Sequence, residues 1–145
     1  MAIVDENERT GPIPTGIWRL NAGRSKLLSP KSSTLWIVEN REDRLSWVAV
    51  ETSPERGTYV ISWQGRYGGP AAQCAGAGIS ARLTCSPPEG IRTEGEFPGI
   101  GTFVETCTLD ATGKRMICRG EVNTPQGLQT YIEYFDWLGE SPHPA

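Results

Sequence analysis

The sequence predicts an all-β fold, a single antiparallel meander closed into a barrel of eight or nine strands. Short runs rich in Val, Ile, Thr, Tyr and Trp recur along the chain, and Gly, Pro, Asn or Asp interrupts each of them. The spacers between these runs, such as NRED, DATGK and NTPQG, are too short to hold the crossover helices of a parallel sheet. A meander of this length must close on itself to hide its two edges.

Nine runs are long enough to cross a barrel once. Residues on alternate positions of a strand share a face, so Leu45, Trp47 and Ala49 lie together on one strand. Tyr59, Ile61 and Trp63 lie together on the next one, which assigns these mostly apolar sets to the interior. The expected strands span residues 17–21, 34–40, 44–51, 58–67, 79–85, 91–96, 101–109, 115–122 and 128–137.

The segments outside these runs are expected to be loops or tails. Residues 22–33 could hold one helical turn or simply loop over one end of the barrel. The small residues of QCAGAG at 73–78 predict a flexible lid over the barrel mouth. Residues 1–14 and 139–145 are expected to be loosely held tails, which leaves 15–138 as the single barrel domain.

The hairpin around DATGK predicts its own register. If ATGK forms the loop, one face of the pair is apolar or small at every position except one glutamate, and the opposite face carries Thr, Arg and Glu. Such agreement between two strands indicates which face is buried. The pairs on the buried face are Leu109 with Met116, Cys107 with Cys118, Glu105 with Gly120, and Phe103 with Val122.

The last hairpin leaves two registers open, because a slip of one residue exchanges the two faces of a strand. A five-residue loop, NTPQG, places Leu128, Thr130, Ile132 and Tyr134 inside. A four-residue loop, TPQG, instead places Tyr131, Glu133, Phe135 and Trp137 inside. We favour the second register because it gathers three aromatic residues on the buried side.

Charge and composition exclude several classes of partner. The 145 residues carry a formal net charge of −3, and their 14 basic residues are spread along the chain without forming a block. We therefore expect no nucleic-acid surface and no membrane patch. The first residues are polar and acidic, with no apolar run of the kind found in a signal peptide or a transmembrane helix. A cytoplasmic location is expected, and a homodimer is compatible with the sequence.

The cysteines and the single histidine argue against metal and cofactor chemistry. Cys74, Cys85, Cys107 and Cys118 form no CxxC pair, and His143 lies in a terminal SPHPA tail. No metal site and no cofactor is expected. Buried thiols are the expected state of cysteines in the cytoplasm, while oxidising conditions could join Cys107 to Cys118 across their hairpin.

Three stretches resemble one known group of proteins. GIWRLNAGRSKLL at 16–28 resembles the G-x-W-x-L-N element, followed by Ser-Lys, that opens small bacterial lipocalin-like (calycin-type) domains. YVISWQGRYGG at 59–69 and GTFVETCTLDATGKRMICRGEV at 101–122 fit the same layout, so the resemblance covers residues 15–138. It implies a barrel with a central cup for apolar ligands, in a group whose relatives include cofactor-free isomerases, cyclases and lyases.

Glu105 and Glu133 are the candidate catalytic residues. Each is a carboxylate expected on an inward, largely apolar face, where a general acid or base can be made without a cofactor. The sequence therefore predicts a cofactor-independent isomerase, cyclase or lyase acting on an apolar or aromatic small molecule. The alternatives are a non-catalytic carrier of such a molecule and a filled barrel with a structural role. Candidate substrate-binding residues are Trp47, Tyr59, Trp63, Phe103, Cys118, Tyr131 and Phe135.

Overall fold

The computed structural model describes residues 13–28, 33–76, 82–85, 91–97 and 101–140. Within these ranges the chain forms ten strands and one short 3-10 helix, Ala22–Arg24, which confirms the all-β prediction. The strands are β1 (Gly16–Leu20), β2 (Ser33–Asn40), β3 (Arg44–Ser53), β4 (Gly57–Arg66), β5 (Ala72–Gln73), β6 (Arg82–Cys85), β7 (Ile91–Phe97), β8 (Gly101–Leu109), β9 (Arg115–Thr124) and β10 (Gly127–Gly139).

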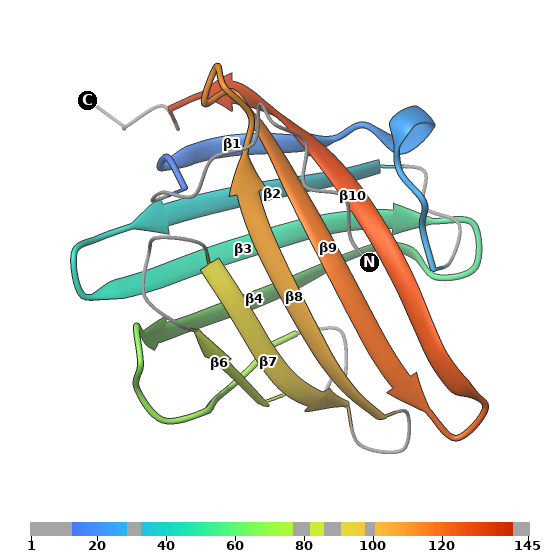
Figure 1. Cartoon of the computed structure of the whole chain (residues 1–145). Helices are drawn as coiled ribbons and strands as arrows, with labels where there is room; N and C mark the ends of the chain where they lie inside the picture. Colours follow the sequence, from blue (N-terminus) through green and yellow to red (C-terminus); the bar gives the residue numbers. More distant parts are fainter. Residues whose placement is uncertain (1–12, 29–32, 77–81, 86–90, 98–100, 141–145) are drawn as a thin grey trace.

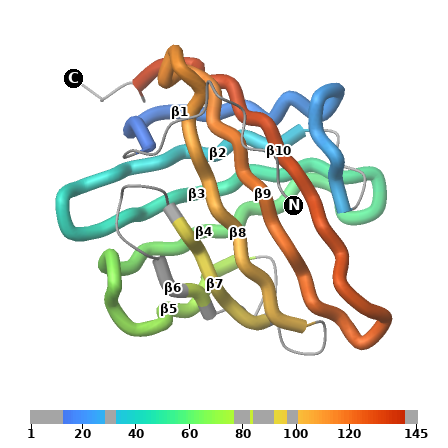
Figure 2. The backbone as a smooth tube through the Cα atoms, in the orientation of Figure 1, coloured from blue at the N-terminus to red at the C-terminus, as the bar shows by residue number. Residues whose placement is uncertain are grey.

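All ten strands belong to one antiparallel sheet in the order β4-β3-β2-β1-β10-β9-β8-β7-β6-β5. The first and last strands pair with each other, with Trp18 opposite Trp137, so the two ends of the curled sheet are β4 and β5. The sheet curls so strongly that β8, β9 and β10 cross the direction of β1 to β4 (Figure 1). The backbone tube shows the same two walls facing each other (Figure 2). These walls bound the interior described below.

The outer strand β4 is joined to the segment that follows β5. Ser62 and Ala75 form an isolated antiparallel bridge in which each backbone N–H donates to the other's carbonyl over 2.9 Å. β5 is a further strand that the sequence did not indicate, and the expectation of a lid at 73–78 is wrong for Gln73 and Ala75. Their backbone is hydrogen-bonded to the sheet, and residues 77 and 78 lie outside the described ranges.

The barrel begins earlier than the sequence suggests. Residues 13 and 14 were expected in a loose tail, but Ile13 is only 1 % exposed. Its carbonyl accepts a hydrogen bond from Nδ2 of Asn40 over 2.9 Å, and the carbonyl of Pro14 accepts one from Nε1 of Trp18 over 3.1 Å. These contacts hold Ile13 and Pro14 against one end of the barrel.

Large side chains fill that same end. Trp18 is fully buried, and it belongs to one cluster with Val38, Leu45 and Trp63, none of which is more than 4 % exposed. Burial of apolar area on this scale is the main favourable term in folding. This packing closes that end of the barrel.

Both hairpin registers favoured from the sequence are confirmed. Glu105 lies opposite Gly120, and Cys107 lies opposite Cys118. In the final hairpin Thr124 pairs with Gly127, which places Tyr131 opposite Gly120 and turns it to the same face as Glu105. None of the helices in the part of the chain that the structure describes is long and apolar enough to cross a membrane.

Candidate functional site

A cavity of about 290 Å³ lies between the two walls of the barrel. Leu28, which lines it, is 45 % exposed, so the cavity reaches the surface at that residue. The volume is at the lower end of the range for small-molecule sites, which suits one ring or two fused rings. The apolar lining comprises Leu28, Trp36, Trp47, Ala49, Ile61, Cys74, Leu83, Phe103, Val122 and Phe135. The polar lining comprises Thr34, Glu51, Thr93, Glu105, Tyr131 and Glu133.

Six of the nine residues singled out from the sequence line this cavity, and three do not. Both candidate catalytic residues are among the six, which are Trp47, Phe103, Glu105, Tyr131, Glu133 and Phe135. Tyr59, Trp63 and Cys118 are absent from the lining, although each contacts a residue that lies on it or beside it.

These three residues support the wall instead of forming it. The hydroxyl of Tyr59 donates to Oε2 of the cavity residue Glu51 over 2.5 Å. Trp63 stacks on Trp47 with ring centroids 6.5 Å apart, and its Nε1 donates to the carbonyl of Ala72 over 2.9 Å. Cys118 is 1 % exposed and is bonded to Cys107.

Glu105 has a partner that sequence reasoning missed. The hydroxyl of Tyr131 donates a short hydrogen bond to Oε2 of Glu105. The two residues lie on β8 and β10, which are separated by β9, and Gly120 is the residue of β9 directly between them. A β-carbon at Gly120 would overlap the Tyr131 ring, so only glycine lets that ring lie across β9 and reach Glu105.

Tyr131 acts as a donor at this position because it stays protonated. Burial raises the pKa of its hydroxyl far above the ordinary value, and the negative charge of Glu105 raises it further. The negative charge of Glu133 raises the pKa of Tyr131 in the same direction, but less. A hydrogen bond from a neutral donor to a carboxylate contributes about 1.5–3 kcal/mol, enough to fix the orientation of Glu105 inside the cavity.

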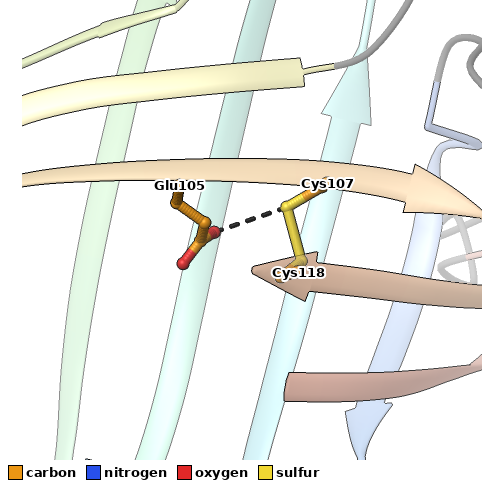
Figure 3. Close-up of side chains that lie close together, drawn as sticks. All are labelled: Glu105, Cys107 and Cys118. Carbon is orange, nitrogen blue, oxygen red and sulfur yellow. Dashed lines mark hydrogen bonds between the residues drawn. A yellow bond between two sulfur atoms is a disulfide. The ribbon is translucent and has the colours of Figure 1, made fainter. Parts of the chain in front are cut away.

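Cys107 and Cys118 form a disulfide across the β8–β9 hairpin, with their Cα atoms 4.1 Å apart. The expectation of two buried thiols is therefore wrong: the register brings the sulfurs together directly. Sγ of Cys107 lies 3.4 Å from Oε1 of Glu105, on the same side of β8 (Figure 3). Disulfides are typical of oxidising compartments. The disulfide therefore does not support a cytoplasmic location, which stays a prediction.

Glu105, Cys107 and Cys118 also lie close enough together to be compared with a metal site. The ligand atoms of Glu105, Cys107 and Cys118 all lie within 4.8 Å of one another. Cysteine binds metal as a thiolate, and the disulfide removes both thiolates. In its oxidised state this cluster supplies one carboxylate and no soft ligand, which does not fit a zinc or iron centre.

Ten further lining residues were not recognised from the sequence as part of a site, and five of them lie on β2, β3 and β4. Trp36 contacts Trp47 edge-on, with ring centroids 5.9 Å apart, and Ile61 is the inward neighbour of Trp63 on β4. Thr34 and Glu51 form a directly opposed pair on β2 and β3. The inward alternation of the 34–40 and 44–51 runs is the signal that could have placed them, because Glu51 follows Trp47 and Ala49 at the same spacing.

Cys74 is expected to be chemically inert in the folded protein. It is 7 % exposed and not bonded to another cysteine, and burial raises the pKa of its thiol to about 11. Since only the thiolate is alkylated, iodoacetamide at pH 8 should modify Cys74 more than tenfold more slowly in the native protein than in urea. Peptide mass spectrometry measures both rates, and equal rates would show that the thiol is accessible.

Comparison with known proteins adds no relative. No protein-family model matches the chain, and neither the curated proteins nor the solved structures contain a match.

Proposed function

We propose that the protein takes up an apolar or aromatic small molecule in the barrel cavity and catalyses a proton transfer on it without a cofactor, as an isomerase, cyclase or lyase. The observation that carries the proposal is the Tyr131–Glu105 hydrogen bond inside a cavity walled mainly by aromatic and aliphatic side chains. The lipocalin-like layout suggested by the sequence is consistent with such a central cup.

Glu105 is the proposed general base or acid. Tyr131 holds its carboxylate toward the cavity, and a carboxylate with fixed geometry in an apolar space transfers protons efficiently. Glu133 lines the same cavity, so it can take the complementary role of proton donor or acceptor. Trp47, Phe103 and Phe135 supply flat walls that orient a ring system.

A carrier without chemistry is the second candidate, because the cavity alone supports binding. The two functions differ in one respect. In an enzyme the carboxylate of Glu105 must lie next to a reacting atom, whereas in a carrier it only accepts a hydrogen bond from the ligand.

The ring opening of 5-nitrobenzisoxazole tests the proposal, since the probe is neutral, bicyclic and opened by a base alone. The base removes the C3 proton, the C–H electrons complete the nitrile, and the N–O bond breaks to release a coloured phenolate. We expect the protein to accelerate this reaction and Glu105→Gln to slow it about 100-fold. Glu94→Gln, on the exposed face of β7, is the matched control and should leave the rate unchanged.

Indole binding, measured by calorimetry, separates the outcomes. If indole binds and Glu105→Gln opens the probe as fast as the parent protein, catalysis by Glu105 is excluded and the carrier function remains. If neither indole nor the probe binds, the cavity does not serve a small molecule and the proposal is overturned.

A further inference from the structure

The sulfur of Cys107 lies beside the carboxylate that we propose as the catalytic base. Glu105 and Cys107 are two residues apart on β8, so their side chains share one face of that strand. Sγ of Cys107 lies 3.4 Å from Oε1 of Glu105 (Figure 3). The hydroxyl of Tyr131 donates to the other oxygen, Oε2. The two oxygens of the carboxylate therefore have different neighbours.

The chemical state of Cys107 decides what its sulfur offers to Oε1 of Glu105. A thiol carries a hydrogen and donates it, although weakly, to an oxygen. In the disulfide with Cys118 the sulfur has no hydrogen, so its contact with Oε1 contains no hydrogen bond. Cys107 and Cys118 are each only 1 % exposed, which keeps bulk water away from both side chains. The disulfide thus withholds a donor on this side of Glu105.

A thiol that donated to Oε1 would weaken Glu105 as a base. A hydrogen bond to the ionised form of a carboxyl group stabilises that form and lowers the pKa of the group. The carboxylate then removes a proton from a substrate less readily. A free Cys107 thiol would remain a donor, because burial and a neighbouring negative charge both raise the pKa of a thiol.

We propose that Cys107 and Cys118 are positioning residues for the proton transfer: by bonding to each other they keep the Cys107 thiol from donating to Glu105, which stays a strong base. Neither residue belongs to the cavity lining, so both act only through Glu105. The inference rests on the proposed function, because it names what sets the strength of the base in the same site.

Two variants without the disulfide differ only in the Cys107 thiol. Cys118→Ala leaves this thiol free next to Glu105, whereas the double variant Cys107→Ala/Cys118→Ala has no sulfur there. Both variants lose the same cross-link, so its loss does not enter the comparison. The other ionisable and polar groups around Glu105 are also the same in both, and their effects cancel. These groups are Tyr131 and Glu133 on β10, Glu51 on β3, and Thr93, which lies opposite Glu105 on β7.

The titration of Glu105 is the first measurement. It is followed by the carbon-13 NMR signal of the side-chain carboxyl group, which is assigned by its absence in Glu105→Gln. We expect Glu105 to bind its proton about threefold to tenfold more weakly in Cys118→Ala than in the double variant, which is the effect of one weak hydrogen bond.

The pH profile of 5-nitrobenzisoxazole ring opening is the second measurement. In Cys118→Ala its midpoint should move to lower pH and its plateau should fall about twofold to fivefold relative to the double variant, because a weaker base removes the C3 proton more slowly. A variant that only displaced Glu105 would lower the plateau without moving the midpoint.

The parent protein supplies both states without any substitution. Refolding in dithiothreitol keeps it as the dithiol, since the reagent gives two electrons and two protons to the S–S bond and closes to its own cyclic disulfide. The reduced protein should group with Cys118→Ala in the proton affinity of Glu105, and the oxidised protein with the double variant. This pair of samples tests the inference even if the two variants do not fold.

The outcomes distinguish this inference from the proposed function. Equal proton affinity of Glu105 in all four samples, or tighter proton binding wherever the Cys107 thiol is free, would overturn the inference and leave the proposed function in place. A lower plateau with an unmoved midpoint would overturn it too. If no sample opens the probe, the proposed function fails, and the NMR titration still decides whether the thiol donates to Glu105.

Discussion

Replacing Trp18 by alanine is expected to lower the free energy of unfolding by about 4 kcal/mol, which is the range for deleting a fully buried tryptophan. Trp18 is 0 % exposed, and its ring lies in the cluster that fills the closed end of the barrel. The substitution also removes the donor to the carbonyl of Pro14 and so releases the chain that crosses this end. Urea unfolding followed by circular dichroism measures the change.

Two control variants show whether the loss of stability in Trp18→Ala comes from the buried ring. Trp18→Phe keeps most of the ring and loses only the Nε1 hydrogen bond, so it should cost less than half as much. Val60→Ala changes a side chain that is 48 % exposed and should cost less than about 0.5 kcal/mol. A Trp18→Ala protein as stable as the Val60→Ala protein would contradict the packing of the closed end.

Replacing Gly120 by alanine is expected to destabilise the protein by about 1–3 kcal/mol, the usual cost of forcing an extra group into a packed core. The new methyl group would overlap the ring of Tyr131, so the ring must turn away and the hydrogen bond to Glu105 is lost. The variant should also show the loss of 5-nitrobenzisoxazole ring opening expected of Glu105→Gln.

A double-mutant cycle isolates this effect from the general cost of changing a strand residue. In a Tyr131→Ala background the space above Gly120 is free, so Gly120→Ala should become neutral or stabilising by up to about 1 kcal/mol. Gly23→Ala is the control at a glycine whose nearest neighbour, Oδ1 of Asn21, is 3.7 Å from an added β-carbon. An equal cost of Gly120→Ala in both backgrounds would show that Tyr131 does not lie over Gly120.

The strand order and the inward face of the C-terminal hairpins could be predicted from the sequence. In each hairpin the apolar faces of two paired strands must coincide, and this requirement restricts the register. On 101–109 and 115–122 only one register places apolar or small residues together, and that register placed Glu105 in the interior. The final hairpin offered two registers, and the gathering of Tyr131, Phe135 and Trp137 on one face was enough to select the correct one.

The remaining parts depend on contacts that no local pattern contains. β5 has only two residues, Ala72 and Gln73, and it owes its extended shape to pairing with Leu83 and Arg82 and to the nearby bridge at Ser62. Tyr131 was expected inside, but not as the partner of Glu105, because the two are separated by a whole strand. The sequence contained one signal of this contact, Gly120. A glycine at an inward-facing position of a strand leaves room for the aromatic ring of a neighbouring strand to lie over it.

The measurement closest to the central claim is a crystal structure of the protein grown with 5-bromoindole, a neutral bicyclic probe whose bromine has an anomalous signal. The account predicts one bromine peak inside the barrel between Trp47 and Phe135, with the carboxylate of Glu105 turned toward the bound ring and hydrogen-bonded to Tyr131. A barrel interior without a bromine peak, or a Glu105 side chain that points into bulk solvent, would contradict it.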